Sequence, residues 1–180
     1  MDVRPAPARR HAPALFLYAA LALLFQAPTL AGGRFFVAGD VLKTELPWHE
    51  PGARAHNNYI NDSVHVHYPL GKTLCASLQA GRLPFWDPSA ACGAPIYYQA
   101  LRCLLLPYRL ALALTCDPLW MGALRLFLAL TLGGWCMSRL LLARGLAAPG
   151  ALFGGAVWMF NSFALVNLVH KYDTFVALLP

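Results

Sequence analysis

Residues 14–31 read ALFLYAALALLFQAPTLA, an uncharged stretch that follows Arg4, Arg9 and Arg10. As a helix it would be about 27 Å long, close to the roughly 30 Å hydrocarbon core of a bilayer. Because Lys and Arg gather on the cytoplasmic side of a membrane, the preceding arginines predict a cytoplasmic N-terminus. A basic start and small residues ending at Ala31 are also typical of a cleaved signal peptide. With either interpretation, the residues that follow are predicted to be exported.

Two further apolar stretches, residues 119–143 and 151–169, predict membrane helices two and three. The turn between them includes Arg144 and follows Arg139, which places this turn in the cytoplasm and agrees with the N-terminal charges. The apolar run 174–180 is too short to span. We therefore expect the sequence to be the N-terminal part of a larger protein.

The composition supports a membrane protein. Hydrophobic residues make up 58% of the chain and charged residues 12%, against roughly 25% charged residues in ordinary globular domains. The net charge of +6 comes from scattered residues without a basic run, which argues against nucleic acid as a partner. The expected fold is an all-α, polytopic helical protein of the cell membrane, in contact with membrane lipid.

Three regions follow: a cytoplasmic N-terminus with the first helix (1–31), an extracytoplasmic loop (32–118) and the later helices (119–180). The loop is too long for a simple connection and too rich in aromatic residues for disorder. Apolar residues at Leu70, Leu74 and Leu78 predict an amphipathic helix over 70–80, with Gly81 as its cap. Residues 97–115 predict an interfacial helix, with a full span as the alternative, because Arg102, Pro107 and Arg109 make spanning costly.

Two acids of the loop, Asp40 and Asp62, are the candidate catalytic residues. A carboxylate beside the membrane can accept a proton from a hydroxyl or hold a divalent cation against a phosphate. The alternative is that each one caps a turn or pairs with an arginine. On a strand, His65 and His67 would share a face that Asp62 could join. No established metal-binding spacing accompanies them, so we predict no metal site, and the cofactor requirement stays open.

Two arginines are candidates for binding a phosphate, and four cysteines are candidates for disulfides. Arg102 and Arg125 could grip an anionic lipid phosphate, since the guanidinium fork matches its geometry; alternatively Arg125 extends along its helix towards water. Four cysteines (Cys75, Cys92, Cys103 and Cys116) would face an oxidising compartment, and three pairings are open.

The run from residue 61 to 107 resembles the YfhO-type bacterial membrane proteins, which look like glycosyltransferases of the GT-C superfamily. The resemblance lies in an ordered set of elements: Asp62, Tyr68-Pro69, Gly81-Arg-Leu-Pro84-Phe-Trp86-Asp87-Pro88, Gly93-Ala-Pro95 and an apolar continuation to Pro107. One departure is Asp87, where the family usually has Asn.

This resemblance implies a membrane-embedded enzyme that moves a sugar from a polyprenyl-phosphate donor to an extracytoplasmic acceptor. It assigns the essential loop acid to Asp62 first and Asp40 second, and the stabilisation of the departing lipid phosphate to Arg102 or Arg125. His65 and His67 are further candidates for substrate binding. The Trp86 segment is interpreted as a structural turn rather than a platform for a sugar. The competing hypothesis is a non-catalytic transporter or lipid flippase.

Overall fold

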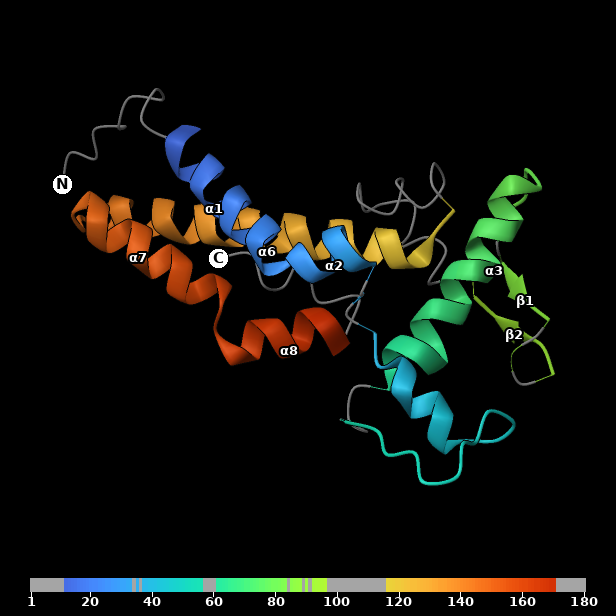
Figure 1. The fold of residues 1–180 in the computed structure, drawn as a ribbon. Coiled ribbons are helices and arrows are strands. Elements are labelled where there is room, and N and C mark those ends of the chain that lie inside the picture. Colours follow the sequence, from blue (N-terminus) through green and yellow to red (C-terminus); the bar gives the residue numbers. More distant parts are fainter. Residues whose placement is uncertain are drawn as a thin grey trace. The chain divides into compact units, whose positions relative to one another are not determined.

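The structure is a computed structural model that describes residues 12–33, 35, 37–56, 61–83, 85–88, 90, 92–96 and 116–170. These residues are mostly helical, with one short pair of strands (Figure 1). They divide into two compact units, one formed by the described parts of 1–36 and 125–180, the other by those of 37–124. The division falls within one helix, α6, after Leu124.

The first unit contains α1 (Ala12–Phe25), α2 (Ala27–Gly32), most of α6 (Pro118–Ala143), α7 (Ala148–Met159) and α8 (Ser162–His170). Its core is a cluster of buried side chains contributed by α1, α6 and α7, including Tyr18, Leu130 and Met159. Tyr18 is fully buried, and its hydroxyl donates a hydrogen bond of 3.1 Å to the carbonyl of Leu152 on α7. A hydroxyl in such a core needs a partner, which this carbonyl provides.

Glycines let these helices pack closely. A Cβ added at Gly155 would collide with the Tyr18 hydroxyl and lie 2.6 Å from the carbonyl oxygen of Gly134. A Cβ at Gly133 would collide with the ring of Trp158. Small residues at such crossings bring helix backbones together, as is common between membrane helices.

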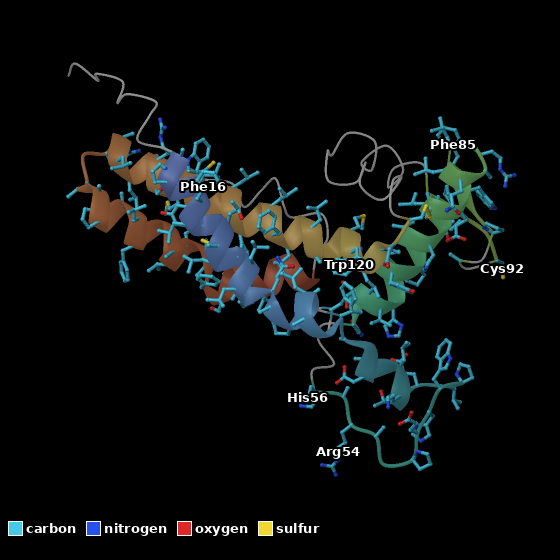
Figure 2. All side chains as sticks on the ribbon, turned by 45° about the horizontal axis from the view of Figure 1, so that its top comes forward. Phe16, Arg54, His56, Phe85, Cys92 and Trp120 are labelled. Carbon is cyan, nitrogen blue, oxygen red and sulfur yellow. A yellow bond between two sulfur atoms is a disulfide. The ribbon has the colours of Figure 1, made fainter. Side chains whose placement is uncertain are left out.

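The outer surface of this unit is apolar. Phe16 is 73% exposed on α1, Leu24 72%, Phe153 72% on α7 and Phe163 68% on α8; Figure 2 shows Phe16 pointing away from its helix. Neither α1 nor α7 contains a charged residue. Helices that are apolar on every side are typical of protein cores and membranes.

One helix of the described residues, α6, is long and apolar enough to cross a membrane, with 26 residues that include Arg125 and Arg139. Length and composition are weak evidence, because buried helices of soluble proteins share them. The helix matches the predicted segment 119–143 to within one residue.

The other two predicted spans are each divided into two helices, so the expectation of unbroken helices was wrong. The first is interrupted at Gln26, shortly before Pro28, which has no N–H to donate to the preceding turn. In the second, the Asn161 side chain accepts the N–H of Ala164 at 2.8 Å and donates to the carbonyl of Trp158 at 2.5 Å. Asn161 thus closes α7 and caps the start of α8.

The second unit begins with the 3₁₀-helix η2 (Gly39–Thr44) and continues with the π-helical turn η4 (Ser63–His67), which leads into α3 (Tyr68–Gln79). The helix predicted over 70–80 is confirmed, with Leu74 as its most buried apolar residue. Gly81 ends it at φ +66°, while the N–H of Arg82 bonds the carbonyl of Ser77 at 2.9 Å. This is the left-handed glycine cap that the sequence predicts.

A two-stranded antiparallel hairpin follows, in which β1 (Trp86–Asp87) pairs with β2 (Ala94–Pro95). Gly93 precedes β2 at φ +114°, and an added Cβ there would lie 2.6 Å from the Trp86 ring. The Trp86 indole therefore packs directly on the backbone of Gly93. The segment predicted as a structural turn thus contains the first strand of a hairpin.

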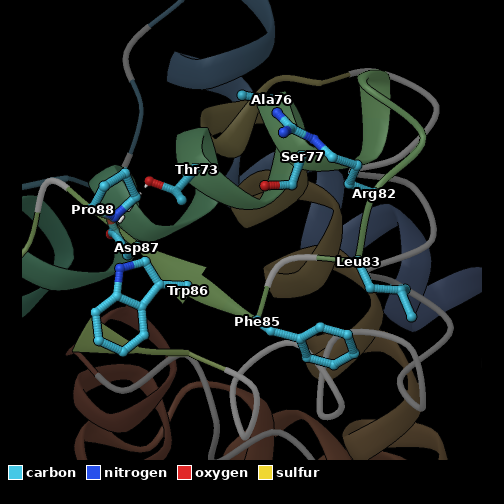
Figure 3. Close-up of a pocket in the computed structure, with 9 residues that line it drawn as sticks. All are labelled: Thr73, Ala76, Ser77, Arg82, Leu83, Phe85, Trp86, Asp87 and Pro88. Atoms are coloured by element: carbon cyan, nitrogen blue, oxygen red, sulfur yellow. Dashed lines mark hydrogen bonds between the residues drawn. The ribbon is translucent and has the colours of Figure 1, made fainter. Parts of the chain in front are cut away.

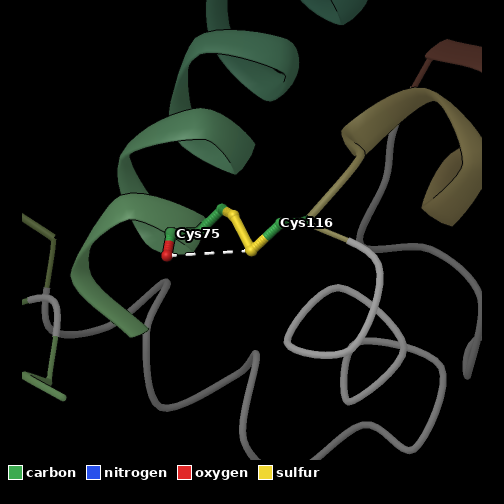
Figure 4. Close-up of a disulfide and its surroundings, with 2 residues drawn as sticks. All are labelled: Cys75 and Cys116. Atoms are coloured by element: carbon green, nitrogen blue, oxygen red, sulfur yellow. Dashed lines mark hydrogen bonds between the residues drawn. A yellow bond between two sulfur atoms is a disulfide. The ribbon is translucent and has the colours of Figure 1, made fainter. Parts of the chain in front are cut away.

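A disulfide between Cys75 on α3 and Cys116, two residues before α6, closes this unit (Figure 4). Nearby, a Cβ on Gly71 would lie 2.9 Å from Pro118 Cβ, so α3 also packs against the start of α6. The predicted helix over 97–115, which lies between the two disulfide cysteines in the sequence, is outside the described residues.

Candidate functional site

In the second unit, η2, η4 and the residues next to them carry several acidic and imidazole side chains. Two contacts join these elements: the N–H of Ala38 donates to the Ser63 hydroxyl at 3.5 Å, and His65 Nε2 lies 3.2 Å from Glu45 Oε2. Val41 on η2 and Val64 on η4 are buried. We call the polar residues on or next to these two elements, Asp40, Glu45, Asp62 and His65, the η2–η4 cluster.

Asp40 closes a loop. Its Oδ2 accepts the backbone N–H of His56 at 2.7 Å and lies 3.6 Å from the Nδ1 of the same residue. The His56 N–H holds the pKa of the Asp40 carboxyl below its ordinary value, because the hydrogen bond stabilises the ionised form. A carboxylate with a lowered pKa is a weaker proton acceptor. The structure thus shows Asp40 in a loop-closing contact, and its catalytic role stays a prediction.

The side chain of His56 itself is fully exposed and projects from the loop (Figure 2). Its contribution to the Asp40 contact is mainly that of its backbone.

Asp62 lies directly before η4, at intermediate exposure and with helical backbone angles. His65 follows three residues later. Asp62 and His65 thus belong to one continuous helical turn. Of the two acids predicted from the sequence, Asp62 is the one directly before η4, the element that carries His65.

The prediction that His65 and His67 share a face was wrong. They lie on a π-helical turn and not on a strand, and residues two apart on a helix do not face each other. His65 contacts Glu45, whereas His67 lies at the junction with α3. Among the described residues, no three His, Cys, Asp or Glu side chains are grouped as metal ligands.

Glu45 is the member of the cluster that sequence reasoning missed. Its exposed fraction is 43% and that of His65 is 34%, so both can meet a solute while touching each other. A carboxylate that holds the proton of one imidazole nitrogen leaves the other nitrogen as the acceptor. Twenty residues separate the two in sequence, and no local pattern marks such a pairing.

Neither predicted arginine is among the described residues of the second unit. Arg125 is 2% exposed and belongs to the first unit, on α6. Arg102 lies outside the described residues.

A groove forms between α3 and the β1 side of the hairpin, about 530 Å³ in volume (Figure 3). The hydroxyls of Thr73 and Ser77 line it from α3, and Asp87 lies opposite them. Thr73 donates to Asp87 Oδ2 at 3.4 Å. Asp87, the residue that departs from the family pattern, is 5% exposed, so its role is to tie the hairpin to α3.

No protein-family model matches this chain, and comparisons with curated proteins and with solved structures give no significant match. The functional argument therefore rests on the residues themselves.

Proposed function

We propose that this chain is part of a membrane-embedded glycosyltransferase that moves a sugar from a polyprenyl-phosphate donor to an acceptor outside the cytoplasm. The observation that carries the proposal is the partly exposed Glu45–His65 pair, in which His65 follows Asp62 by three residues on the same helical turn. Such a group of acid and imidazole side chains is equipped to bind and deprotonate a hydroxyl.

The membrane location is supported by the first unit. Its helices α1 and α7 carry no charge, and aromatic and aliphatic side chains cover their outer surfaces. Large exposed apolar surfaces mark contact with lipid or with further protein. We infer that 14–31, 119–143 and 151–169 pass through the membrane, with breaks at Gln26 and Asn161 inside the first and third passes.

The extracytoplasmic location of the second unit is supported by the Cys75–Cys116 disulfide, because disulfides persist in oxidising compartments. It agrees with the charge asymmetries at both ends of the loop. Cysteine labelling in a Cys92→Ser, Cys103→Ser background tests this topology: Ala90→Cys is expected to react with an impermeant reagent from outside and Ala147→Cys from the cytoplasm. Labelling of Ala147→Cys from outside would contradict the proposal.

In the proposed reaction the acceptor hydroxyl attacks the anomeric carbon of the donor sugar. A new carbon–oxygen bond forms as the bond to the lipid phosphate breaks. The hydroxyl proton passes to Asp62, and the added negative charge leaves on the polyprenyl phosphate. We assign orientation of the acceptor hydroxyl to His65, held by Glu45. The resemblance leaves stabilisation of the leaving phosphate to Arg102 or Arg125, as the sequence predicts.

Activity measurements separate these roles. With a polyprenyl-phosphate-linked hexose as donor and the full-length protein in liposomes, Asp62→Asn is expected to lower kcat by about 10²–10⁴-fold, the usual contribution of a general base. Glu45→Gln is expected to raise the acceptor KM more than it lowers kcat. Unchanged transfer in Asp62→Asn, with the protein inserted normally, would refute the assignment.

The competing function is a transporter or lipid flippase without catalysis, and the observation that favours it is Arg125. A buried arginine in a membrane helix commonly marks a pathway for an ion or an anionic headgroup. Movement of the polyprenyl-phosphate lipid across the liposome membrane without release of its sugar would support this function instead.

A further inference from the structure

The groove between α3 and the hairpin has the features of a binding site in its own right. Its volume of about 530 Å³ lies within the range of about 300–1,000 Å³ that is usual for small-molecule pockets. All of its lining residues come from one compact unit. The η2–η4 cluster involves none of them.

One wall of the groove is polar. Thr73 and Ser77 are four residues apart on α3, so their hydroxyls lie on the same side of the helix. In Figure 3 the Ser77 hydroxyl points into the space that Thr73 and Asp87 border on its other side. These groups offer hydrogen-bond donors and acceptors along the groove.

The other wall is aromatic. Phe85 is 52% exposed and Trp86 56% exposed, both at the groove. Trp86 is held in place because its ring packs against Gly93, where a Cβ would lie 2.6 Å away. An exposed aromatic ring fixed by its support loses little conformational freedom when a ligand stacks on it.

The charges in the groove balance. Arg82 contributes one cation and Asp87 one carboxylate. A phosphate or a strongly acidic ligand would meet the Asp87 charge, whereas a neutral ligand rich in hydroxyls would find partners on both walls. Sugar rings have such a character, with C–H groups on one face and hydroxyls around the edge.

We propose that this groove binds an uncharged carbohydrate segment, with a sugar ring against Trp86 and its hydroxyls bonded to Ser77, Thr73 and Arg82. The use of this segment as the glycosyl acceptor rests on the proposed function; the binding itself does not. This proposal departs from the sequence-based interpretation, in which the Trp86 segment is a structural turn rather than a platform for a sugar.

The test measures binding of neutral hexasaccharides of glucose, mannose, galactose and N-acetylglucosamine to the full-length protein in detergent micelles, without donor, by saturation-transfer NMR. At least one is expected to bind, and a hexamer of galacturonic acid is expected to bind more weakly. Absence of binding by all four neutral sugars, or preference for the acidic one, would overturn the proposal.

Variants locate the site. Trp86→Ala is expected to weaken binding about tenfold and Trp86→Phe about threefold, since the smaller ring keeps part of the stacking. Trp48→Ala is the matched control, because Trp48 is 60% exposed in the same unit and does not line the groove. An intact Cys75–Cys116 disulfide and an unchanged unfolding temperature show that each variant is folded. If Trp86→Ala binds as tightly as Trp48→Ala, the groove is not the site.

The two proposals fail separately. Asp62→Asn is expected to keep full carbohydrate binding while losing transfer. If Asp62→Asn transfers sugar normally and Trp86→Ala still loses binding, the catalytic assignment fails and the carbohydrate groove stands.

Discussion

Replacing Gly155 by alanine tests the close packing of α1, α6 and α7. The added Cβ would lie 2.6 Å from the Gly134 carbonyl oxygen and in collision with the Tyr18 hydroxyl. Ordinary contact begins at 3.4 Å, so the backbones must separate by about 0.8 Å or the helices must shift. Because one obstacle is backbone, a change of side-chain rotamer cannot relieve the collision.

The magnitude follows from three effects. Overpacking costs about 1–3 kcal/mol, and displacing the Tyr18 hydroxyl from the Leu152 carbonyl costs about 0.5–1.5 kcal/mol. Alanine offsets about 1 kcal/mol through its higher helix propensity. We expect Gly155→Ala to lower the free energy of unfolding by about 2 kcal/mol.

Gly150→Ala is the matched control on the same helix, since Gly150 is exposed and its added Cβ would meet only a leucine methyl at 3.9 Å. It is expected to leave stability unchanged or raise it by up to about 1 kcal/mol. The assay is equilibrium unfolding in mixed micelles with increasing dodecyl sulfate. In the Tyr18→Phe background Gly155→Ala is expected to cost less, because the hydroxyl that it strikes is gone. Equal free energies of unfolding for Gly155→Ala and Gly150→Ala would refute the close packing of α7 against α1 and α6 at Gly155.

Three further predictions follow from the second unit. Cys75→Ser removes a disulfide between residues 41 positions apart and is expected to lower the free energy of unfolding of the second unit by about 4 kcal/mol, from chain entropy. The expected readout is rapid proteolysis, which dithiothreitol should reproduce in the wild type. Identical proteolysis of the wild type with and without reductant would contradict this prediction. Gly93→Ala is expected to displace Trp86 and expose its indole, which acrylamide quenching of fluorescence measures against Gly52→Ala, where the added Cβ meets nothing. The hydrogen bond from the His56 N–H to Asp40 is expected to be present at neutral pH and to be lost as the pH falls through the lowered pKa of Asp40. The amide resonance of His56 should therefore titrate with a midpoint below 3.8, the ordinary pKa of an aspartate. A midpoint at or above 3.8 would refute this prediction.

Hydropathy and residue spacing predicted the helices whose formation depends mainly on residues close together in the sequence. The long charge-poor stretch gives α6, and the spacing of Leu70, Leu74 and Leu78 with Gly81 gives α3. The break at Asn161 was missed although asparagine is a common N-cap, because the apolar stretch continues through it. Hydropathy averages over a window and does not register a single capping residue.

The candidate site was predictable only in part. Asp62 and His65 are close in sequence, and both were singled out. The contact of His65 with Glu45, the hydrogen bond from His56 to Asp40 and the choice of Cys116 as partner of Cys75 join residues 16 to 41 positions apart. Such pairings depend on how the loop folds back on itself, which neither spacing nor composition encodes.

The assignment of Asp62 as base, with Asp40 as a loop-closing residue, is the central claim about mechanism. The most direct measurement compares the two isosteric variants, Asp62→Asn and Asp40→Asn, for sugar transfer from a polyprenyl-phosphate donor by the full-length protein in liposomes. The predicted result is a loss of about 10²–10⁴-fold in kcat for Asp62→Asn and a kcat within about threefold of wild type for Asp40→Asn. Full activity of Asp62→Asn, or a larger loss in Asp40→Asn than in Asp62→Asn, would contradict it.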